Sequence, residues 1–224
     1  MSETKIGRHI MTTPVKICGL KDPENLQAAI DNGARYVGFV FYEPSPRHVT
    51  FDIAWNLARA VPTGVRSVGL FVNPTDEQIE RILTGVQLDM VQLHGDETPQ
   101  RVAEIKAKYK MPVMKAIRVA TAADLDQLEE FEAAADWLLF DAKADGDDKT
   151  MMGGTGHSFD WNILKGRTPT KPWMLSGGLT ADNVADALKT LSPTALDISS
   201  GVEITRGQKD AAKIAEFMTA VKAV

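Results

Sequence analysis

Eight short β-rich segments that alternate with stretches of helical periodicity constrain the fold of this 224-residue chain more than any other feature. Helical spacing is clear at Ile79, Ile82 and Val86, where apolar residues recur every three or four positions. Strands that alternate with helices pair in parallel, and eight such units predict an α/β protein with the (β/α)8 barrel of the TIM type. A doubly wound open sheet is the alternative. The expected strands are Val15–Cys18, Tyr36–Phe41, Val65–Phe71, Met90–Leu93, Val113–Ala116, Trp137–Phe140, Trp173–Leu175 and Ala195–Ile198.

Composition and charge limit the domain count and the partners. We expect one barrel domain over residues 14–224, preceded by a flexible tail over residues 1–13, which are polar and aperiodic. The net charge is −5 and the chain has no basic run, so nucleic acid is not an expected partner. No apolar run approaches membrane-spanning length, and the first residues lack the hydrophobic core of a signal peptide. The single cysteine fits a reducing compartment, so we expect a cytoplasmic protein.

Two glycine-containing turns come after the last two expected strands, in Leu175-Ser-Gly-Gly-Leu179 and Asp197-Ile-Ser-Ser-Gly201. A helix-like pattern follows each turn, at residues 183–191 and 210–221. Glycine lets the backbone approach an anion closely, and consecutive N–H groups at a helix start attract phosphate. Barrels of this class often bind phosphate after their seventh and eighth strands. The sequence therefore predicts phosphate binding at these turns, by Gly177, Gly178, Ser200 and Gly201.

Two reactive side chains are expected at the C-terminal end of the barrel, where such folds carry out their chemistry. Cys18 ends the first strand, and strand alternation puts Lys16 on the same face, where an ammonium would favour the thiolate. Asp141 follows the apolar sixth strand. The first and sixth strands lie nearly opposite in a ring of eight, so the two side chains would face each other as a base and an acid. A buried structural cysteine and a helix-capping aspartate are the alternatives.

Three further polar residues belong to the same end of the barrel. Arg47 follows Pro44 and Pro46, which stiffen its loop, and it could clamp a substrate carboxylate or lie in solvent. His94 ends the fourth strand, where it could orient substrate or bond a loop carbonyl, and Asp197 lies in the eighth strand. The four histidines form no spaced ligand pair, so neither a metal nor another cofactor is expected. The Gly-rich segment 142–158 is either a lid or a merely flexible loop.

Taken together, these segments resemble phosphoribosylanthranilate isomerases, the barrel enzymes of tryptophan biosynthesis. The resemblance covers all but the first fourteen residues. It rests on Val15-Lys-Ile-Cys-Gly-Leu20, Pro44-Ser-Pro-Arg47, Val91-Gln-Leu-His-Gly-Asp96, Phe140-Asp-Ala-Lys143, Gly153-Gly-Thr-Gly156 with Phe159-Asp-Trp161, Leu175-Ser-Gly-Gly-Leu179 with Asn183-Val184, and Ser199-Ser-Gly-Val-Glu203 with Gly207 and Lys209-Asp210.

The resemblance implies an isomerase that acts on a small phosphorylated substrate without a cofactor. The reaction would be the Amadori rearrangement of N-(5-phosphoribosyl)anthranilate to 1-(2-carboxyphenylamino)-1-deoxyribulose 5-phosphate. Asp141 would protonate the ribose ring oxygen and Cys18 would remove the C2′ proton. Residues that match the family's substrate contacts are Arg47, His94, Gln92 and Asp197, and Gly154 joins the phosphate-binding set. The chain is expected to be a monomer or a homodimer.

Two other functions remain open from the sequence. A related aminoaldose-phosphate isomerase of histidine biosynthesis has a similar fold and reaction, but that family uses aspartates at both catalytic positions, and Cys18 argues against it. A barrel that binds a phosphosugar without turnover would keep the two glycine-containing turns but would not need Cys18 and Asp141.

Overall fold

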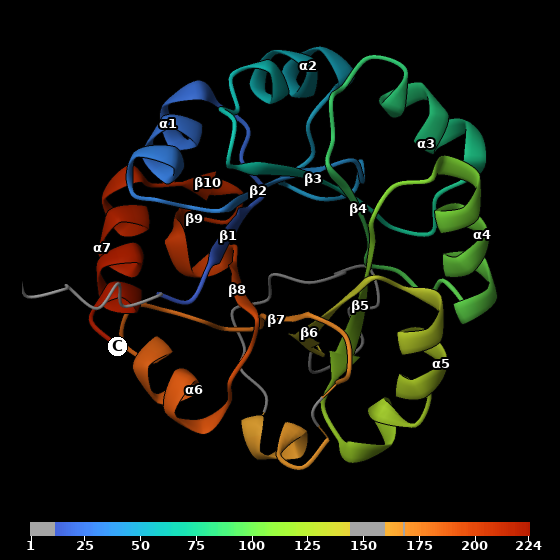
Figure 1. The fold of residues 1–224 in the computed structure, drawn as a ribbon. Helices are drawn as coiled ribbons and strands as arrows, with labels where there is room; N and C mark the ends of the chain where they lie inside the picture. Colours follow the sequence, from blue (N-terminus) through green and yellow to red (C-terminus); the bar gives the residue numbers. More distant parts are fainter. Residues whose placement is uncertain (1–11, 144–159, 168) are drawn as a thin grey trace, which may run out of the picture.

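Eight parallel strands form a closed barrel, with helices between consecutive strands on its outside (Figure 1). The computed structural model describes residues 12–143, 160–167 and 169–224. It confirms the predicted (β/α)8 fold, since the strands follow one another around the ring and β1 pairs with β8. The strands are β1 Val15–Cys18, β2 Tyr36–Val40, β3 Arg66–Phe71, β4 Met90–Leu93, β5 Val113–Val119, β6 Trp137–Ala142, β7 Trp173–Leu175 and β8 Ala195–Ile198.

Two strands extend further than the sequence predicted. β5 and β6 continue to Val119 and Ala142 because they pair with each other along their whole length, as in the register Arg118↔Asp141. Asp141 therefore lies inside β6 rather than after it. Most of segment 142–158, expected to be either a lid or a flexible loop, lies outside the described residues, as do the phosphate contact predicted at Gly154 and most of the predicted N-terminal tail.

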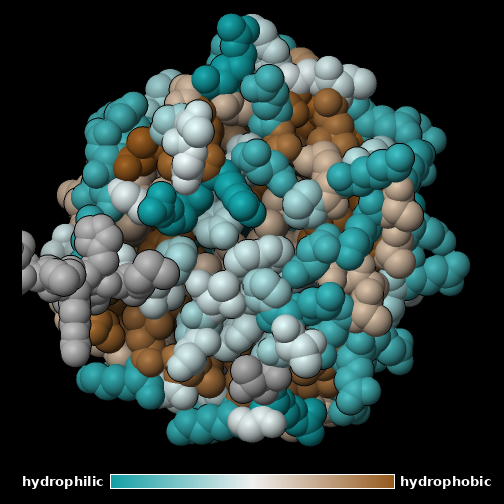
Figure 2. Space-filling model, viewed as in Figure 1, coloured by the Kyte–Doolittle hydropathy of each residue, from teal (hydrophilic) through white to brown (hydrophobic). Residues whose placement is uncertain are grey.

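The helices begin where local capping favours them. Thr75 forms a capping box with Gln78 at the start of α3, and Asp22 caps α1, whose first residue is Pro23. On the face drawn in Figure 2, hydrophilic residues cover most of the outer helices, with smaller hydrophobic areas between them. The helices are α1 Pro23–Asp31, α2 Phe51–Arg59, α3 Asp76–Leu83, α4 Pro99–Tyr109, α5 Leu128–Ala134, α6 Val184–Thr190 and α7 Ala211–Lys222, with short 3₁₀ helices η1 Ala122–Leu125, η2 Trp161–Leu164 and η3 Ser200–Val202.

A small β-hairpin separates β8 from α7, and the sequence did not predict it. It pairs β9 Glu203–Thr205 with β10 Gln208–Lys209 in antiparallel fashion. Strands of three and two residues are too short to show a period in the sequence. Gly207, in the turn, has φ +81°, and a Cβ there would lie 2.6 Å from the Pro46 carbonyl oxygen. Glycine thus lets the hairpin pack against the loop that follows β2.

Side chains fill the barrel interior in layers. One layer is apolar and includes Met90, Met114 and Met174. Lys16, also in the interior, is fully buried, and its Nζ donates to Asp197 Oδ1 at 2.8 Å. The two residues are direct neighbours in the β1–β8 register. Burial works against the charged ammonium, but the charges of Asp197 and Cys18 and the hydrogen bonds to them together outweigh it and raise the pKa of Lys16.

Removing one partner of this buried pair should destabilise the fold strongly. We expect Asp197→Ala to lower the free energy of unfolding by about 3–5 kcal/mol, because an unpaired ammonium remains buried. In the double variant Lys16→Met/Asp197→Ala the charge is gone and a methionine fills the space, so the loss should be smaller. Urea denaturation of Asp197→Ala, Lys16→Met and the double variant measures this. A double variant less stable than either single variant would contradict the account.

Candidate functional site

A pocket lies at the C-terminal end of the barrel strands, and most sequence-predicted site residues line it. Sequence analysis missed several other lining residues: Ser176 and Ser199, which are polar, and Tyr42, Leu70 and Val72, which are apolar. The two serines lie within the predicted turn sequences, so their position beside the assigned residues was the available signal. The predicted residues in the lining are Cys18, Arg47, His94, Asp141, Gly177, Gly178, Asp197, Ser200 and Gly201.

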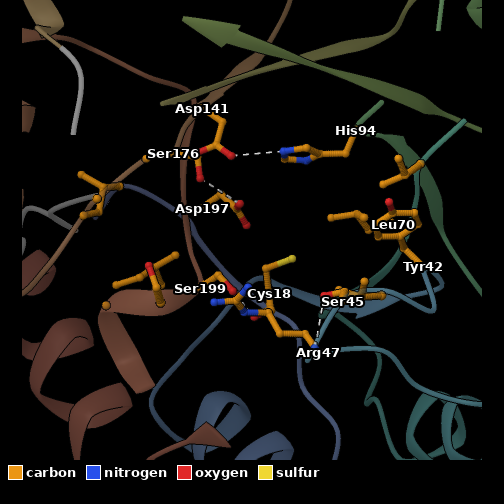
Figure 3. Close-up of a pocket in the computed structure, with 18 residues that line it drawn as sticks. Cys18, Tyr42, Ser45, Arg47, Leu70, His94, Asp141, Ser176, Asp197 and Ser199 are labelled. Atoms are coloured by element: carbon orange, nitrogen blue, oxygen red, sulfur yellow. Dashed lines mark hydrogen bonds and ion pairs between the residues drawn. The ribbon is translucent and has the colours of Figure 1, made fainter. Parts of the chain in front are cut away.

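Cys18 and Asp141 lie on different sides of this pocket, as the sequence predicted (Figure 3). Each is about 4% exposed. Gly38, the register neighbour of Cys18 on β2, gives the thiol room, because a Cβ at that position would lie 2.9 Å from Cys18 Sγ. The arrangement can therefore accept a ligand between a thiol and a carboxyl group.

Lys16 favours the Cys18 thiolate as expected, but burial outweighs its effect. Burial raises the pKa of the Cys18 thiol, and the positive charge of Lys16 only partly opposes this. The negative charge of Asp197, which bonds to the Lys16 ammonium, adds to the effect of burial and also raises the pKa of Cys18. Strand alternation predicted the shared face of Lys16 and Cys18 but not the anion that pairs with Lys16.

Asp141 is held by a short chain of side chains. His94 Nε2 lies 3.1 Å from Asp141 Oδ2, and Gln92 Nε2 lies 2.9 Å from His94 Nδ1. Since an amide NH₂ donates, His94 in this arrangement accepts at Nδ1 and donates from Nε2 to Asp141. Inside β6 and bonded to His94, Asp141 does not cap a helix. Gln92 is fully buried and does not line the pocket, so its contact is with His94 and not with the pocket.

Arg47 is buried at the pocket and not in solvent, which excludes the surface alternative. Its Nε and Nη2 donate to the two carboxylate oxygens of Glu203 at 2.8 and 2.9 Å. Lys209 Nζ donates to Glu203 Oε1 at 2.7 Å, and the Gly207 N–H donates to Oε2 at 3.0 Å. Glu203 and Lys209 stand on the unpredicted hairpin. Both occurred in the motifs that suggested the family, but nothing in the sequence linked them to Arg47.

Asp197 and Ser199 line the pocket and also bond to residues of β1. The Ser176 hydroxyl donates to Asp197 Oδ2 at 3.2 Å, while the other carboxylate oxygen accepts from Lys16. The Ser199 hydroxyl donates to the Cys18 carbonyl oxygen at 3.1 Å. Asp197 thus faces the pocket as an anion that the protein already pairs on both oxygens.

The two predicted phosphate turns pack directly against each other. Gly177 and Gly178 have φ +84° and +63°, and a Cβ at Gly201 would lie 2.0 Å from the Leu179 carbonyl oxygen. Among the described residues, the N–H groups of Gly178 and Ser200 donate no hydrogen bond. The helices expected at residues 183–191 and 210–221 are confirmed as α6 and α7. Neither begins directly at its turn, since α6 starts at residue 184 and η3 and the hairpin precede α7. The donors are therefore those of the turns themselves.

Within the described ranges, no group of three or more His, Cys, Asp or Glu residues could hold a metal ion. In the same part of the chain, no helix has the length and apolar character needed to cross a membrane.

The ionic contacts of Glu203 should appear as a loss of stability in acid. Burial alone would raise the pKa of Glu203, but its bonds to Arg47 and Lys209 outweigh this and lower the pKa from 4.5 to about 2. A lowered folded-state pKa stabilises the fold above pH 4.5 and loses that contribution as the pH falls toward 2. We expect a decline of about 3 kcal/mol in the free energy of unfolding over this range. Denaturant titrations of the wild type and Glu203→Gln test it. Parallel declines in the two proteins would contradict the assignment.

Known proteins match this chain over nearly its whole length. The family model described as N-(5′-phosphoribosyl)anthranilate (PRA) isomerase matches residues 15–220. An N-(5′-phosphoribosyl)anthranilate isomerase of Rhodospirillum centenum is 55% identical, with 96% of this chain and 100% of that protein covered.

Two solved structures are similar in fold as well as sequence. The phosphoribosyl anthranilate isomerase of Thermotoga maritima is 34% identical with a TM-score of 0.84, covering 95% of this chain and 100% of the other. The structure of a phosphoribosyl anthranilate isomerase in complex with reduced 1-(o-carboxyphenylamino)-1-deoxyribulose 5-phosphate is 32% identical with a TM-score of 0.81 and the same coverage. This chain belongs to the N-(5′-phosphoribosyl)anthranilate isomerase family.

Proposed function

We propose that Cys18 and Asp141 catalyse the Amadori rearrangement of N-(5-phosphoribosyl)anthranilate to 1-(2-carboxyphenylamino)-1-deoxyribulose 5-phosphate, a step of tryptophan biosynthesis. The observation that carries this proposal is a thiol and a carboxyl group on different sides of one pocket that two glycine-containing turns also line. Further support comes from the related isomerase solved with a reduced form of the product. The substrate is thus a small phosphorylated molecule.

Asp141 acts first, as a general acid. It donates a proton to the ribose ring oxygen, the bond between that oxygen and C1′ breaks, and the nitrogen lone pair forms a Schiff base. Cys18, as thiolate, then removes the C2′ proton, and the electron pair moves to give an enolamine. The enol proton leaves and C1′ gains a proton, which yields the ketone. Each proton taken by one group is matched by a proton delivered to the substrate, so the reaction is an isomerisation without a redox partner.

The two ends of the substrate carry different anions, and the pocket offers a different partner for each. The N–H groups around Gly178 and Ser200 suit the phosphate, because turns of this kind present donors without side chains in the way. Gly177 and Gly201 complete that site. Arg47 suits the anthranilate carboxylate, which a planar guanidinium recognises well. Holding both ends fixes the reacting carbons between Cys18 and Asp141.

The remaining polar residues support the reacting groups. His94 donates to Asp141 and borders the pocket, so it can orient both the acid and the substrate. Gln92 acts only through His94, which revises its expected role as a substrate contact. Asp197 borders the pocket and neutralises Lys16 beneath Cys18. A cytoplasmic location and a monomeric or homodimeric state remain predictions from the sequence.

The two alternative functions are less well supported. An aminoaldose-phosphate isomerase with aspartates at both catalytic positions does not match a pocket with Cys18 in the place of the base. A barrel that only binds a phosphosugar would not need the space that Gly38 leaves for the Cys18 thiol. It would also not need the bond between His94 and Asp141.

Two conservative variants test the proposed roles. We expect Cys18→Ser and Asp141→Asn each to reduce kcat by about 10²–10⁴-fold while substrate binding is retained, as for the loss of a positioned base or acid. The decrease of anthranilate-type fluorescence measures turnover. A pre-opened Schiff-base analogue should restore much of the rate in Asp141→Asn but not in Cys18→Ser, because only the former lacks the ring-opening step. Near-normal turnover in either folded variant would contradict the assignment of that residue.

A further inference from the structure

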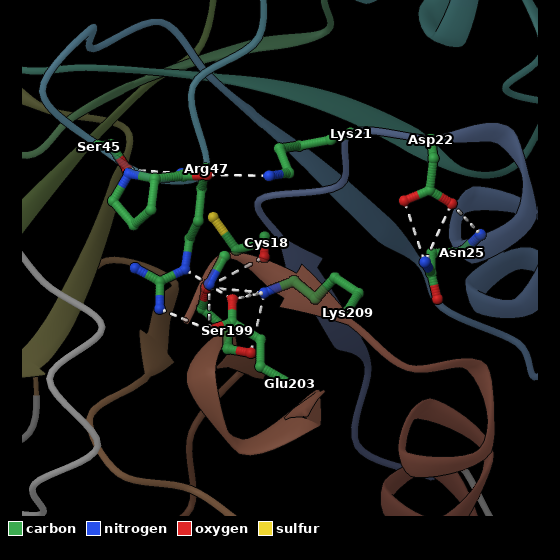
Figure 4. Close-up of polar contacts among 11 residues, drawn as sticks. Cys18, Lys21, Asp22, Asn25, Ser45, Arg47, Ser199, Glu203 and Lys209 are labelled. Atoms are coloured by element: carbon green, nitrogen blue, oxygen red, sulfur yellow. Dashed lines mark hydrogen bonds and ion pairs between the residues drawn. The ribbon is translucent and has the colours of Figure 1, made fainter. Parts of the chain in front are cut away.

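Positive charge is in excess beside the pocket, in a group of three residues that we call the Arg47 cluster: Arg47, Glu203 and Lys209. Both cations donate to the same carboxylate, at 2.7–2.9 Å, and all three side chains are buried (Figure 4). Two cations and one anion leave the cluster with a formal charge of +1. Arg47 borders the pocket, whereas Lys209 and Glu203 do not.

Lys209 is fixed behind Arg47 by several bonds. Besides Glu203, its Nζ bonds the carbonyl oxygen and the hydroxyl of Ser199, at 2.9 and 3.0 Å. The charged or titratable groups that face it are Glu203 on β9, Arg47 on the loop after β2, and Cys18 on β1. Lys21, on the loop after β1, donates from its Nζ to the Pro46 carbonyl oxygen. Lys209 therefore has a defined position but no direct access to a ligand.

We propose that Lys209 supplies the surplus positive charge that lets Arg47 attract the carboxylate of the substrate while Arg47 is already paired with Glu203. An arginine–glutamate pair alone is neutral, so an approaching carboxylate would meet the Glu203 charge as well as the guanidinium. Lys209 offsets that negative charge from a position outside the pocket lining. Lys209 is thus a specificity-determining residue that acts through Arg47, and the inference rests on the proposed role of Arg47.

The affinity for the substrate carboxylate should therefore fall as the pH rises through about 8. Burial lowers the pKa of Lys209 to about 8, with Glu203 opposing the shift and Arg47 adding to it. As the pH rises through about 8, Lys209 loses its proton and the Arg47 cluster becomes neutral. An arginine at position 209 stays charged throughout this range, so it removes the dependence that arises from this position. Cys18 is present in both the wild type and Lys209→Arg, so its own titration contributes to both pH profiles and does not distinguish them.

Ligand binding in four proteins tests the proposal: the wild type, Lys209→Met, Lys209→Arg and Arg47→Ala. The two ligands are the reduced product analogue and the same molecule without its carboxylate, and calorimetry measures Kd. We expect Lys209→Met to weaken binding of the carboxylated ligand about tenfold at pH 7, as for the loss of one nearby charge. Lys209→Arg should bind it within about threefold of the wild type. The affinity of the carboxylate-free ligand should change much less in both variants, and that change reports the effect of Lys209 on Ser199 in the phosphate turn.

A compensating variant separates charge from packing. Lys209→Met/Glu203→Gln again has a cluster charge of +1, and it should regain most of the affinity lost in Lys209→Met. If Lys209→Met does not fold, the alkaline fall in affinity, present in the wild type and absent in Lys209→Arg, still tests the idea.

Three outcomes would overturn the inference: unchanged affinity in Lys209→Met, an equal loss for both ligands, or the same alkaline profile in the wild type and Lys209→Arg. If Arg47→Ala leaves the carboxylated ligand unaffected, the proposed role of Arg47 fails instead.

Discussion

The buried ion pair between Lys16 and Asp197 joins the first and last strands of the barrel, and much of the site depends on it. The pair lies at the seam where β1 meets β8, in direct register. Cys18 stands two residues after Lys16, and the phosphate turn begins two residues after Asp197 at Ser199. Closing the barrel therefore also brings the proposed base next to the proposed phosphate site. Burial makes each charge depend on the other, which holds the seam in one register.

Charge is arranged differently at the two ends of the proposed substrate. Near the phosphate, the donors are backbone N–H groups of Gly178 and Ser200, which carry no formal charge. Near the carboxylate, the Arg47 cluster carries a net cation. Between them, the Cys18 thiol lies in a buried setting that raises its pKa. Such a setting limits the amount of free thiolate before substrate binds.

The sequence predicted the barrel and the positions of its main side chains, but few of their partners. Strand alternation and the eightfold count were enough to bring Cys18, Asp141 and the glycine turns to one end. They could not identify the partner of Lys16, which is 181 positions away in the chain. They also missed Glu203 and Lys209, because a hairpin of two very short strands has no readable period. Periodicity indicates the face on which a residue lies, whereas an ion pair depends on which elements, far apart in the chain, come together.

The most direct test of the account is a crystal structure of this protein with the reduced product analogue. Its central claim is that the substrate is held by its two anions with the reacting carbons between Cys18 and Asp141. We predict the phosphate at the N–H groups of Gly178 and Ser200, the carboxylate at Arg47, and C2′ within about 3–3.5 Å of Cys18 Sγ. A ligand bound in the reverse orientation, or with C2′ remote from Cys18 while Asp141 contacts no part of the sugar, would contradict it.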